Sequence, residues 1–96
     1  MALYISLLTF TQKGVEAVKH QASRMDAIKQ AYKAAGGELI AYYATMGQYD
    51  GVVVYRMPDD VAAASFILST MSMGNVRSET MRAFGEDEYR QILENL

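Results

Sequence analysis

Apolar residues alternate with polar ones, or run together in short blocks, along four segments of the chain. These segments are rich in Tyr, Ile, Val and Leu and are bounded by glycine or polar residues, a pattern that predicts β-strands. They cover residues 2–10, 38–46, 51–57 and 75–84. The link between the second and third segments is short enough to make those two strands an antiparallel hairpin.

Between the first two predicted strands, the apolar residues recur every three or four positions, which is typical of amphipathic helices. Thr11 is a suitable N-cap for a short helical segment over residues 12–19. Ser23, followed three residues later by Asp26, predicts the start of a second helix. The pair Gly36-Gly37 ends it, because glycine accepts the left-handed conformation common just past a helix.

Two further helices are predicted in the second half of the chain. The run Pro58-Asp59-Asp60 fits a helix start, since proline suits the first turn and acids suit the positive end of the helix dipole. Gly74 stops that helix. The acidic run 86–88 leads a last short helix with an apolar stripe formed by Tyr89, Ile92, Leu93 and Leu96.

The predicted order is therefore β-α-β-β-α-β followed by a C-terminal helix. Two β-α-β crossovers around one hairpin give a ferredoxin-like α+β fold, with a four-stranded antiparallel sheet and helices on one face. The chain contains no repeat, linker or low-complexity segment, so we expect a single domain over residues 1–96.

Both faces of this sheet are predicted to be apolar, although helices can cover only one of them. In the second strand, strict alternation assigns Leu39 and Tyr43 to one face and Tyr42 to the other. An uncovered apolar face is a large patch for a monomer, so we expect two copies to pack sheet on sheet as a dimeric α/β barrel, a homodimer or a higher homo-oligomer. The alternative is a smaller patch whose tyrosines turn their hydroxyls into water.

Composition narrows the functional classes. The chain is 51% hydrophobic and 21% charged with a net charge of −2, so it has no basic footprint for nucleic acid. It has no cysteine, which excludes disulfides, thiolate metal sites and cysteine nucleophiles. No positive segment precedes the first apolar run, and no run is long enough to cross a membrane. We therefore expect a cytoplasmic protein that binds neither nucleic acid nor membranes.

Three stretches together resemble the GYD-domain family of small bacterial and archaeal proteins. They lie at residues 3–11, at 45–50 and at 74–84, and the signature residues match at Gly47, Tyr49 and Asp50. The resemblance covers residues 3 to 93. It implies a ferredoxin-like fold of the dimeric α/β-barrel type, and it implies no activity and no assigned binding residues.

The hairpin carries the first candidates for chemistry. Tyr49 and Asp50 place a phenol beside a carboxylate, which suits a proton relay or a polar ligand. The structural alternative, which we favour, is that Asp50 bonds to the backbone of its own turn. His20 is the only histidine, and with Asp50 it would act as a general base, but its surroundings resemble a solvated helix end.

Arginines and tyrosines are the candidates for ligand binding. Arg77 and Arg82 lie on opposite faces of the fourth strand, and either can hold a carboxylate or a phosphate. The alternative for each, which we favour, is a salt bridge to Glu79 or to a partner chain. Tyr42, Tyr43 and Tyr55 can line an apolar pocket, although a core or dimer interface is the favoured interpretation. No phosphate loop, HExxH motif or catalytic serine elbow occurs, so we predict neither a metal nor a cofactor.

Three functions remain. The favoured one is a small homo-oligomeric binding or assembly module with a small-molecule ligand. The alternative is a cofactor-free enzyme, monooxygenase- or isomerase-like, as in other dimeric α/β barrels. A structural subunit without a ligand is the third.

Overall fold

The computed structural model describes residues 1–20 and 22–96. Its strands are β1 Ala2–Phe10, β2 Glu38–Ala44, β3 Gly51–Met57 and β4 Val76–Ala83. Its helices are α1 Gln12–Ala17, α2 Met25–Ala34, α3 Asp60–Ser72 and α4 Glu86–Glu94, with short 3₁₀ segments η1 Val18–His20 and η2 Ala22–Arg24 between α1 and α2.

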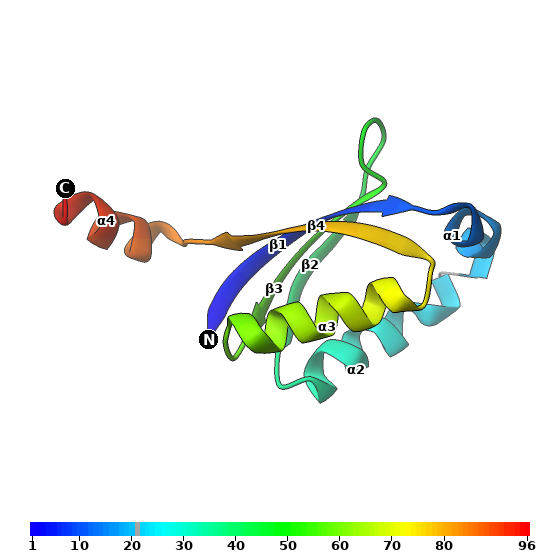
Figure 1. Ribbon diagram of the computed structural model, residues 1–96, viewed down its shortest axis with the longest axis horizontal. Helices are drawn as coiled ribbons and strands as arrows, with labels where there is room; N and C mark the ends of the chain where they lie inside the picture. The colour runs from blue at the N-terminus through cyan, green and yellow to red at the C-terminus, as the bar shows by residue number, and fades with distance from the viewer. Residues whose placement is uncertain (21) are drawn as a thin grey trace.

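The strands form one antiparallel sheet in the order β2-β3-β1-β4. Helices α2 and α3 lie side by side on one face, and α1 lies at the end of the sheet where β1 finishes (Figure 1). In the part of the chain that the structure describes, no helix covers the opposite face (Figure 1). This is the ferredoxin-like α+β arrangement that the element order predicts, and the β2–β3 hairpin is confirmed.

The core lies between the sheet and the two helices. Tyr55 and Met57 on β3 are fully buried, and Tyr4 on the neighbouring β1 stacks against Tyr55 with ring centroids 5.7 Å apart. From the helices, Tyr32 of α2 and Ile67 of α3 join the same cluster. Burial of these large side chains is the main favourable contribution to the fold.

A β-bulge in β2 corrects the predicted assignment of faces. Leu39 pairs with Tyr55, but Ala41 pairs with Val54, so Ile40 is an extra residue in the ladder. Leu39 and Tyr42 therefore both lie on the helix-covered face, where they pack against the core. Strict alternation had placed them on opposite faces, and that prediction was wrong.

Helix starts agree with the sequence at two places and differ at one. Thr11 accepts a hydrogen bond from the Gly14 backbone N–H at 3.1 Å, and Asp59 accepts one from Ala62 at 2.8 Å, so both are N-caps. Ser23 is not an N-cap. It lies in η2 and donates to the His20 carbonyl, while α2 begins at Met25 without a side-chain cap. The 3₁₀ turn competes here with the predicted capping box.

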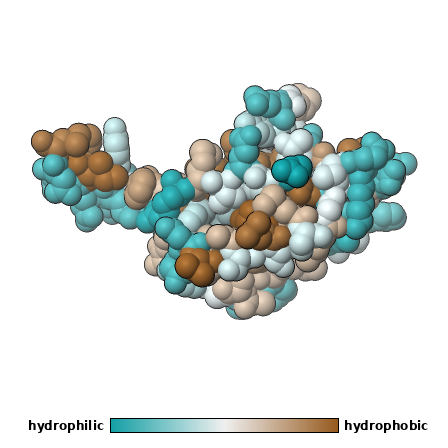
Figure 2. All heavy atoms as spheres, in the orientation of Figure 1, coloured by the Kyte–Doolittle hydropathy of each residue, from teal (hydrophilic) through white to brown (hydrophobic). Residues whose placement is uncertain are grey.

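Helix α4 leaves the body of the protein. It follows β4 and extends beyond the end of the sheet, away from α2 and α3 (Figure 1). Its predicted apolar stripe is exposed: Tyr89 is 55% accessible and Leu93 48%. Figure 2 shows hydrophobic side chains gathered on the projecting arm. Among the described residues, no helix is long and apolar enough to cross a membrane.

Candidate functional site

The hairpin loop before β3 is tied to the end of β1. One carboxylate oxygen of Asp50, Oδ2, accepts a hydrogen bond from the Phe10 backbone N–H at 2.8 Å, and the Asp50 N–H donates to the Leu8 carbonyl. Gly47 supplies a φ of 106°, which favours glycine. These contacts give Asp50 a structural role and leave its carboxylate committed to the backbone.

Tyr49 faces β4 from the same loop. Its hydroxyl donates to Oε2 of Glu79 at 2.8 Å, and this hydrogen bond raises the pKa of the phenol. The pair lies at the surface, on the side of the sheet opposite α2 and α3. Glu79 thus pairs with a tyrosine rather than with either arginine of its strand.

His20 lies apart from these residues. It is exposed at the end of η1, and its carbonyl accepts the Ser23 hydroxyl. In the part of the chain that the structure describes, no hydrogen bond or ion pair joins His20 to Asp50. The catalytic grouping of Tyr49, Asp50 and His20 is therefore not assembled in one site.

Arg82 lies at the centre of a cluster on the helix-covered face. Its guanidinium lies 4.6 Å from the Phe84 ring centroid and 5.8 Å from that of Tyr4, and it pairs with Glu88 of α4 at 3.3 Å. The Tyr4 hydroxyl donates to Asp60 at 2.6 Å. Burial and this hydrogen bond raise the Tyr4 pKa to about 12. Tyr4, Asp60 and Arg82 line a groove of about 380 Å³ beside α3.

Arg77 lies on the other face, opposite Thr9 in the β1–β4 ladder. Its side chain is exposed, and no ion pair of Arg77 is found among the described residues. The two arginines therefore lie on opposite faces and do not form one anion site.

The three candidate tyrosines occupy three different environments. Tyr55 is fully buried and hydrogen-bonded to Ser6 at 2.8 Å, so it belongs to the core. Tyr43 is 60% exposed on the helix-free face. Tyr42 lines a cavity under the helices. Adjacent residues of a strand point to opposite faces, so Tyr42 and Tyr43 lie on opposite sides of the sheet, and the bulge places Tyr42 on the same side as Leu39.

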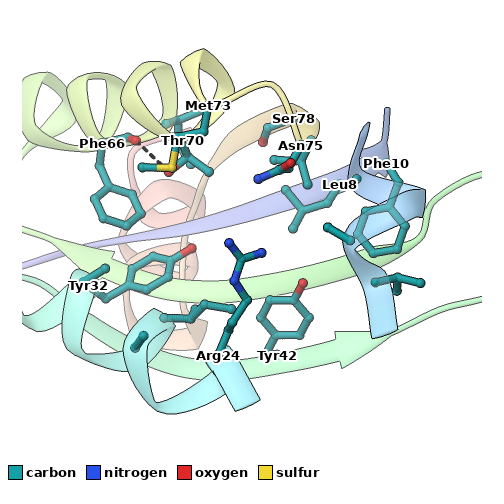
Figure 3. A pocket seen from close by; sticks show the side chains of 18 residues that line it. Leu8, Phe10, Arg24, Tyr32, Tyr42, Phe66, Thr70, Met73, Asn75 and Ser78 are labelled. Atoms are coloured by element: carbon teal, nitrogen blue, oxygen red, sulfur yellow. Dashed lines mark hydrogen bonds between the residues drawn. The ribbon is translucent and has the colours of Figure 1, made fainter. Parts of the chain in front are cut away.

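The cavity occupies about 350 Å³ between the sheet and helices α1, α2 and α3 (Figure 3). Its walls are mostly apolar, with Leu8, Phe10, Ile28 and Phe66 among the lining residues. Polar groups enter at a few places: Arg24, Tyr32, Tyr42, Thr70, Asn75 and Ser78. An apolar cavity with a small set of convergent polar groups is the usual form of a small-molecule site.

Sequence reasoning did not select most of these polar residues. In the sequence, Tyr32 is one of the apolar positions that recur along the second predicted helix, and Arg24 directly follows the predicted cap Ser23. The lining comes from segments far apart in the chain, so no local spacing identifies it. In the described ranges, 1–20 and 22–96, no group of His, Asp or Glu side chains could hold a metal ion.

Comparison with known proteins agrees with this fold. A crystal structure of a protein from Thermus thermophilus superposes with a TM-score of 0.56 at 22% sequence identity, covering 88% of this chain and 95% of that one. At this level of identity the likeness shows a shared fold. The family follows from a second comparison. The GYD domain model matches residues 4–93, and the chain belongs to the GYD domain family.

One relative has a name that describes a function. It is the glutamine synthetase and cystathionine beta-lyase binding protein of Thermus thermophilus, 31% identical over 84 residues, which are 86% of this chain and 88% of the relative. That relative is named for binding proteins and not for a reaction.

Proposed function

We propose that the chain, folded as a single domain, is a homo-oligomeric binding module whose function is to dock onto other proteins. The observation that carries the homo-oligomeric part of this proposal is the helix-free face of the sheet. Its centre is apolar and its edge is charged, with Arg77 and Glu79 on β4, as in a protein–protein interface with a polar rim. The apolar residues of this face are Leu3, Ile5, Leu7, Ala41, Tyr43, Val52, Val54, Met81 and Ala83.

The occupant of this face is a second copy of the chain. Four strands of seven to nine residues, at about 3.4 Å per residue and about 4.8 Å between strands, give a projected area on the order of 500 Å². The accessible area of such a face exceeds its projection. The projected area is therefore a lower bound, to be compared with the roughly 800 Å² that each partner of a stable complex buries.

The exposed helix α4 also supports the proposed dimer. Isolated helices shorter than about 12 residues are marginal in water, and α4 has only nine residues. Among the described residues, its apolar stripe does not belong to the core cluster. A dimer in which α4 packs on the partner would bury that stripe and stabilise the helix.

Protein docking is the part of the proposal that the named relative supports. We expect this dimer to bind the glutamine synthetase or the cystathionine beta-lyase of its own organism. The cofactor-free enzyme has no comparable support, because Tyr49, Asp50 and His20 do not converge and none of them lines the cavity. The cytoplasmic location expected from the sequence stays a prediction.

The oligomeric state is tested by light scattering after size-exclusion chromatography. A dimer has twice the chain mass of 10.7 kDa. Tyr43→Glu combined with Met81→Glu places charge on the open face at positions already 60% and 45% exposed, and should give a monomer that still folds. Leu68→Glu is the matched control, since Leu68 is 64% exposed on α3, on the opposite side. A wild-type monomer at micromolar concentration would overturn the proposed interface.

Docking is tested separately by biolayer interferometry with the two purified enzymes. The wild type should bind at least one of them. The monomeric double variant should bind more weakly, because a dimer can contact an oligomeric enzyme through both of its copies and a monomer through only one. A dimer that binds neither enzyme would leave the interface intact and contradict the docking function.

A further inference from the structure

The cavity under the helices has polar groups arranged around an apolar space. In Figure 3 the guanidinium of Arg24 extends into the cavity, and the hydroxyls of Tyr32 and Tyr42 point toward it from either side. The Asn75 side chain enters from the opposite wall (Figure 3). Arg24 lies at the start of α2 and Tyr32 in its third turn, while Tyr42 belongs to β2 and Asn75 to the α3–β4 link. All four side chains meet in this cavity.

The charge at this cavity is positive. Arg24 is the only charged residue among the described residues of its lining, and no acid within that described part of the chain pairs with it. Arg24 is exposed, so the charged end of the cavity is open to solvent and a ligand can enter there. Arg24 is also the N-cap residue of α2, whose first turn lacks a side-chain cap. The positive end of the α2 dipole lies beside the guanidinium, and the first turn of this helix also carries the acidic Asp26.

Tyr32 supplies an unused donor. Tyr32 is only 6% exposed. Its ring packs against the rings of Tyr55 and Phe66, with centroid distances of 5.1 and 4.4 Å. No hydrogen-bond partner for its hydroxyl is found among residues 1–20 and 22–96. A phenol is protonated at neutral pH at its ordinary pKa of 10.0, and burial raises the pKa of Tyr32 further. The Tyr32 hydroxyl opens to the cavity, because no buried side-chain oxygen or nitrogen among the described residues lacks a partner, and it is free to donate to a ligand atom there.

We propose that this cavity binds a small organic carboxylate with an aromatic or other apolar body. Arg24 pairs with the carboxylate, the Tyr32 hydroxyl donates to the same group, and the body lies among Leu8, Ile28 and Phe66. Arg24 suits this role because its planar guanidinium binds carboxylates through two hydrogen bonds. The volume of about 350 Å³ is near the lower end of the roughly 300–1,000 Å³ of ligand pockets, so the ligand is compact.

This site is independent of the proposed dimer interface, since the two lie on opposite faces of the sheet. Loss of ligand binding should leave the oligomeric state unchanged, and the monomeric double variant should keep its cavity. An experiment can therefore contradict the ligand site without contradicting the dimer interface, and the reverse.

The experiment is a titration of the full chain with phenylacetate and with indole-3-acetate. Binding is measured from the chemical shifts of the backbone amides in NMR spectra and by calorimetry. Each acid is compared with its neutral amide, phenylacetamide or indole-3-acetamide. We expect the acids to bind, with shifts concentrated on the start of α2, on Tyr42 and on Asn75. Arg24→Gln should weaken acid binding about tenfold or more and change amide binding little. Tyr32→Phe should weaken acid binding by a smaller factor.

Arg77→Gln is the matched control, because it removes an exposed arginine from the other face. It should leave acid binding unchanged. The proposal is overturned if the acids do not bind at millimolar concentration, if acids and amides bind equally, or if Arg24→Gln and Arg77→Gln have the same effect.

Discussion

The carboxylate of Asp50 accepts a hydrogen bond from the backbone N–H of Phe10 at 2.8 Å and so joins the hairpin loop to the end of the first strand. At this position β1 has no further partner in β3, because the β1–β3 ladder ends with Leu8 opposite Gly51. The side chain thus replaces a backbone acceptor. Two of the signature positions of the family, Tyr49 and Asp50, hold this loop through hydrogen bonds to other strands.

Asp50→Ala should destabilise the fold by about 1–3 kcal/mol, because it removes a hydrogen bond that involves a charged acceptor. Asp50→Asn keeps an acceptor oxygen and should cost less. Urea unfolding followed by circular dichroism measures both. Gln48→Ala in the same loop changes an exposed residue and is the control. Equal stability of Asp50→Ala and Gln48→Ala would show that the loop is not held by this carboxylate.

Gly14→Ala should destabilise the protein by about 3 kcal/mol, the upper end of the range for overpacking. A Cβ atom at Gly14 would lie 2.0 Å from the Asn75 carbonyl oxygen, so α1 or the α3–β4 link must move. Gly85→Ala is the control, because no atom of the described residues lies within 4 Å of its Cβ position. Thermal unfolding of the two variants should differ clearly, and similar midpoints would contradict the close contact.

The elements were predictable from sequence where local chemistry decides them. Alternation and the short link identified β3, and the run Pro58-Asp59-Asp60 identified the start of α3, although Pro58 precedes the N-cap Asp59 and is not in the first turn. Local chemistry failed at Ser23, where a 3₁₀ turn uses the serine hydroxyl for the His20 carbonyl. It failed again at Ile40, because a bulge depends on the partner strand and leaves no mark on the residue pattern.

The candidate site was less predictable than the fold. Tyr42 was a candidate ligand residue and does line the cavity, whereas Arg24 and Tyr32 were not selected. Their importance comes from which segments meet in space, and from the lack of an acidic partner for Arg24 among the described residues. Neither property is encoded by spacing along the chain.

Stability should fall as the pH rises above 10, partly because of Tyr4. Its pKa rises from 10.0 to about 12 in the folded state, so the folded protein holds this proton more tightly than the unfolded chain. The resulting stabilisation is fully present below pH 10 and is lost as the pH approaches 12. Urea unfolding at a series of pH values should show a shallower decline for Tyr4→Phe than for the wild type. Parallel declines would mean that Tyr4 does not contribute.

Helix α4 should be protected in the dimer and unprotected in the monomer. Amide hydrogen exchange should show slow exchange over residues 86–94 in the wild type and rapid exchange in the Tyr43→Glu, Met81→Glu variant. The amides of β1 and β3 should stay protected in both, since their ladders lie within one chain. Protection of α4 in the monomeric variant would indicate that the helix is stable alone.

The bulge at Ile40 has a consequence for how this strand can change during evolution. Removing Ile40 would leave Leu39 and Ala41 paired with the same residues of β3 and would turn β2 into a regular strand. Tyr42 would still enter the cavity, and Tyr43 would still face the open side. We therefore expect some relatives to lack a residue at position 40. Such a deletion shortens the chain but leaves Tyr42 on the helix-covered face and Tyr43 on the helix-free face.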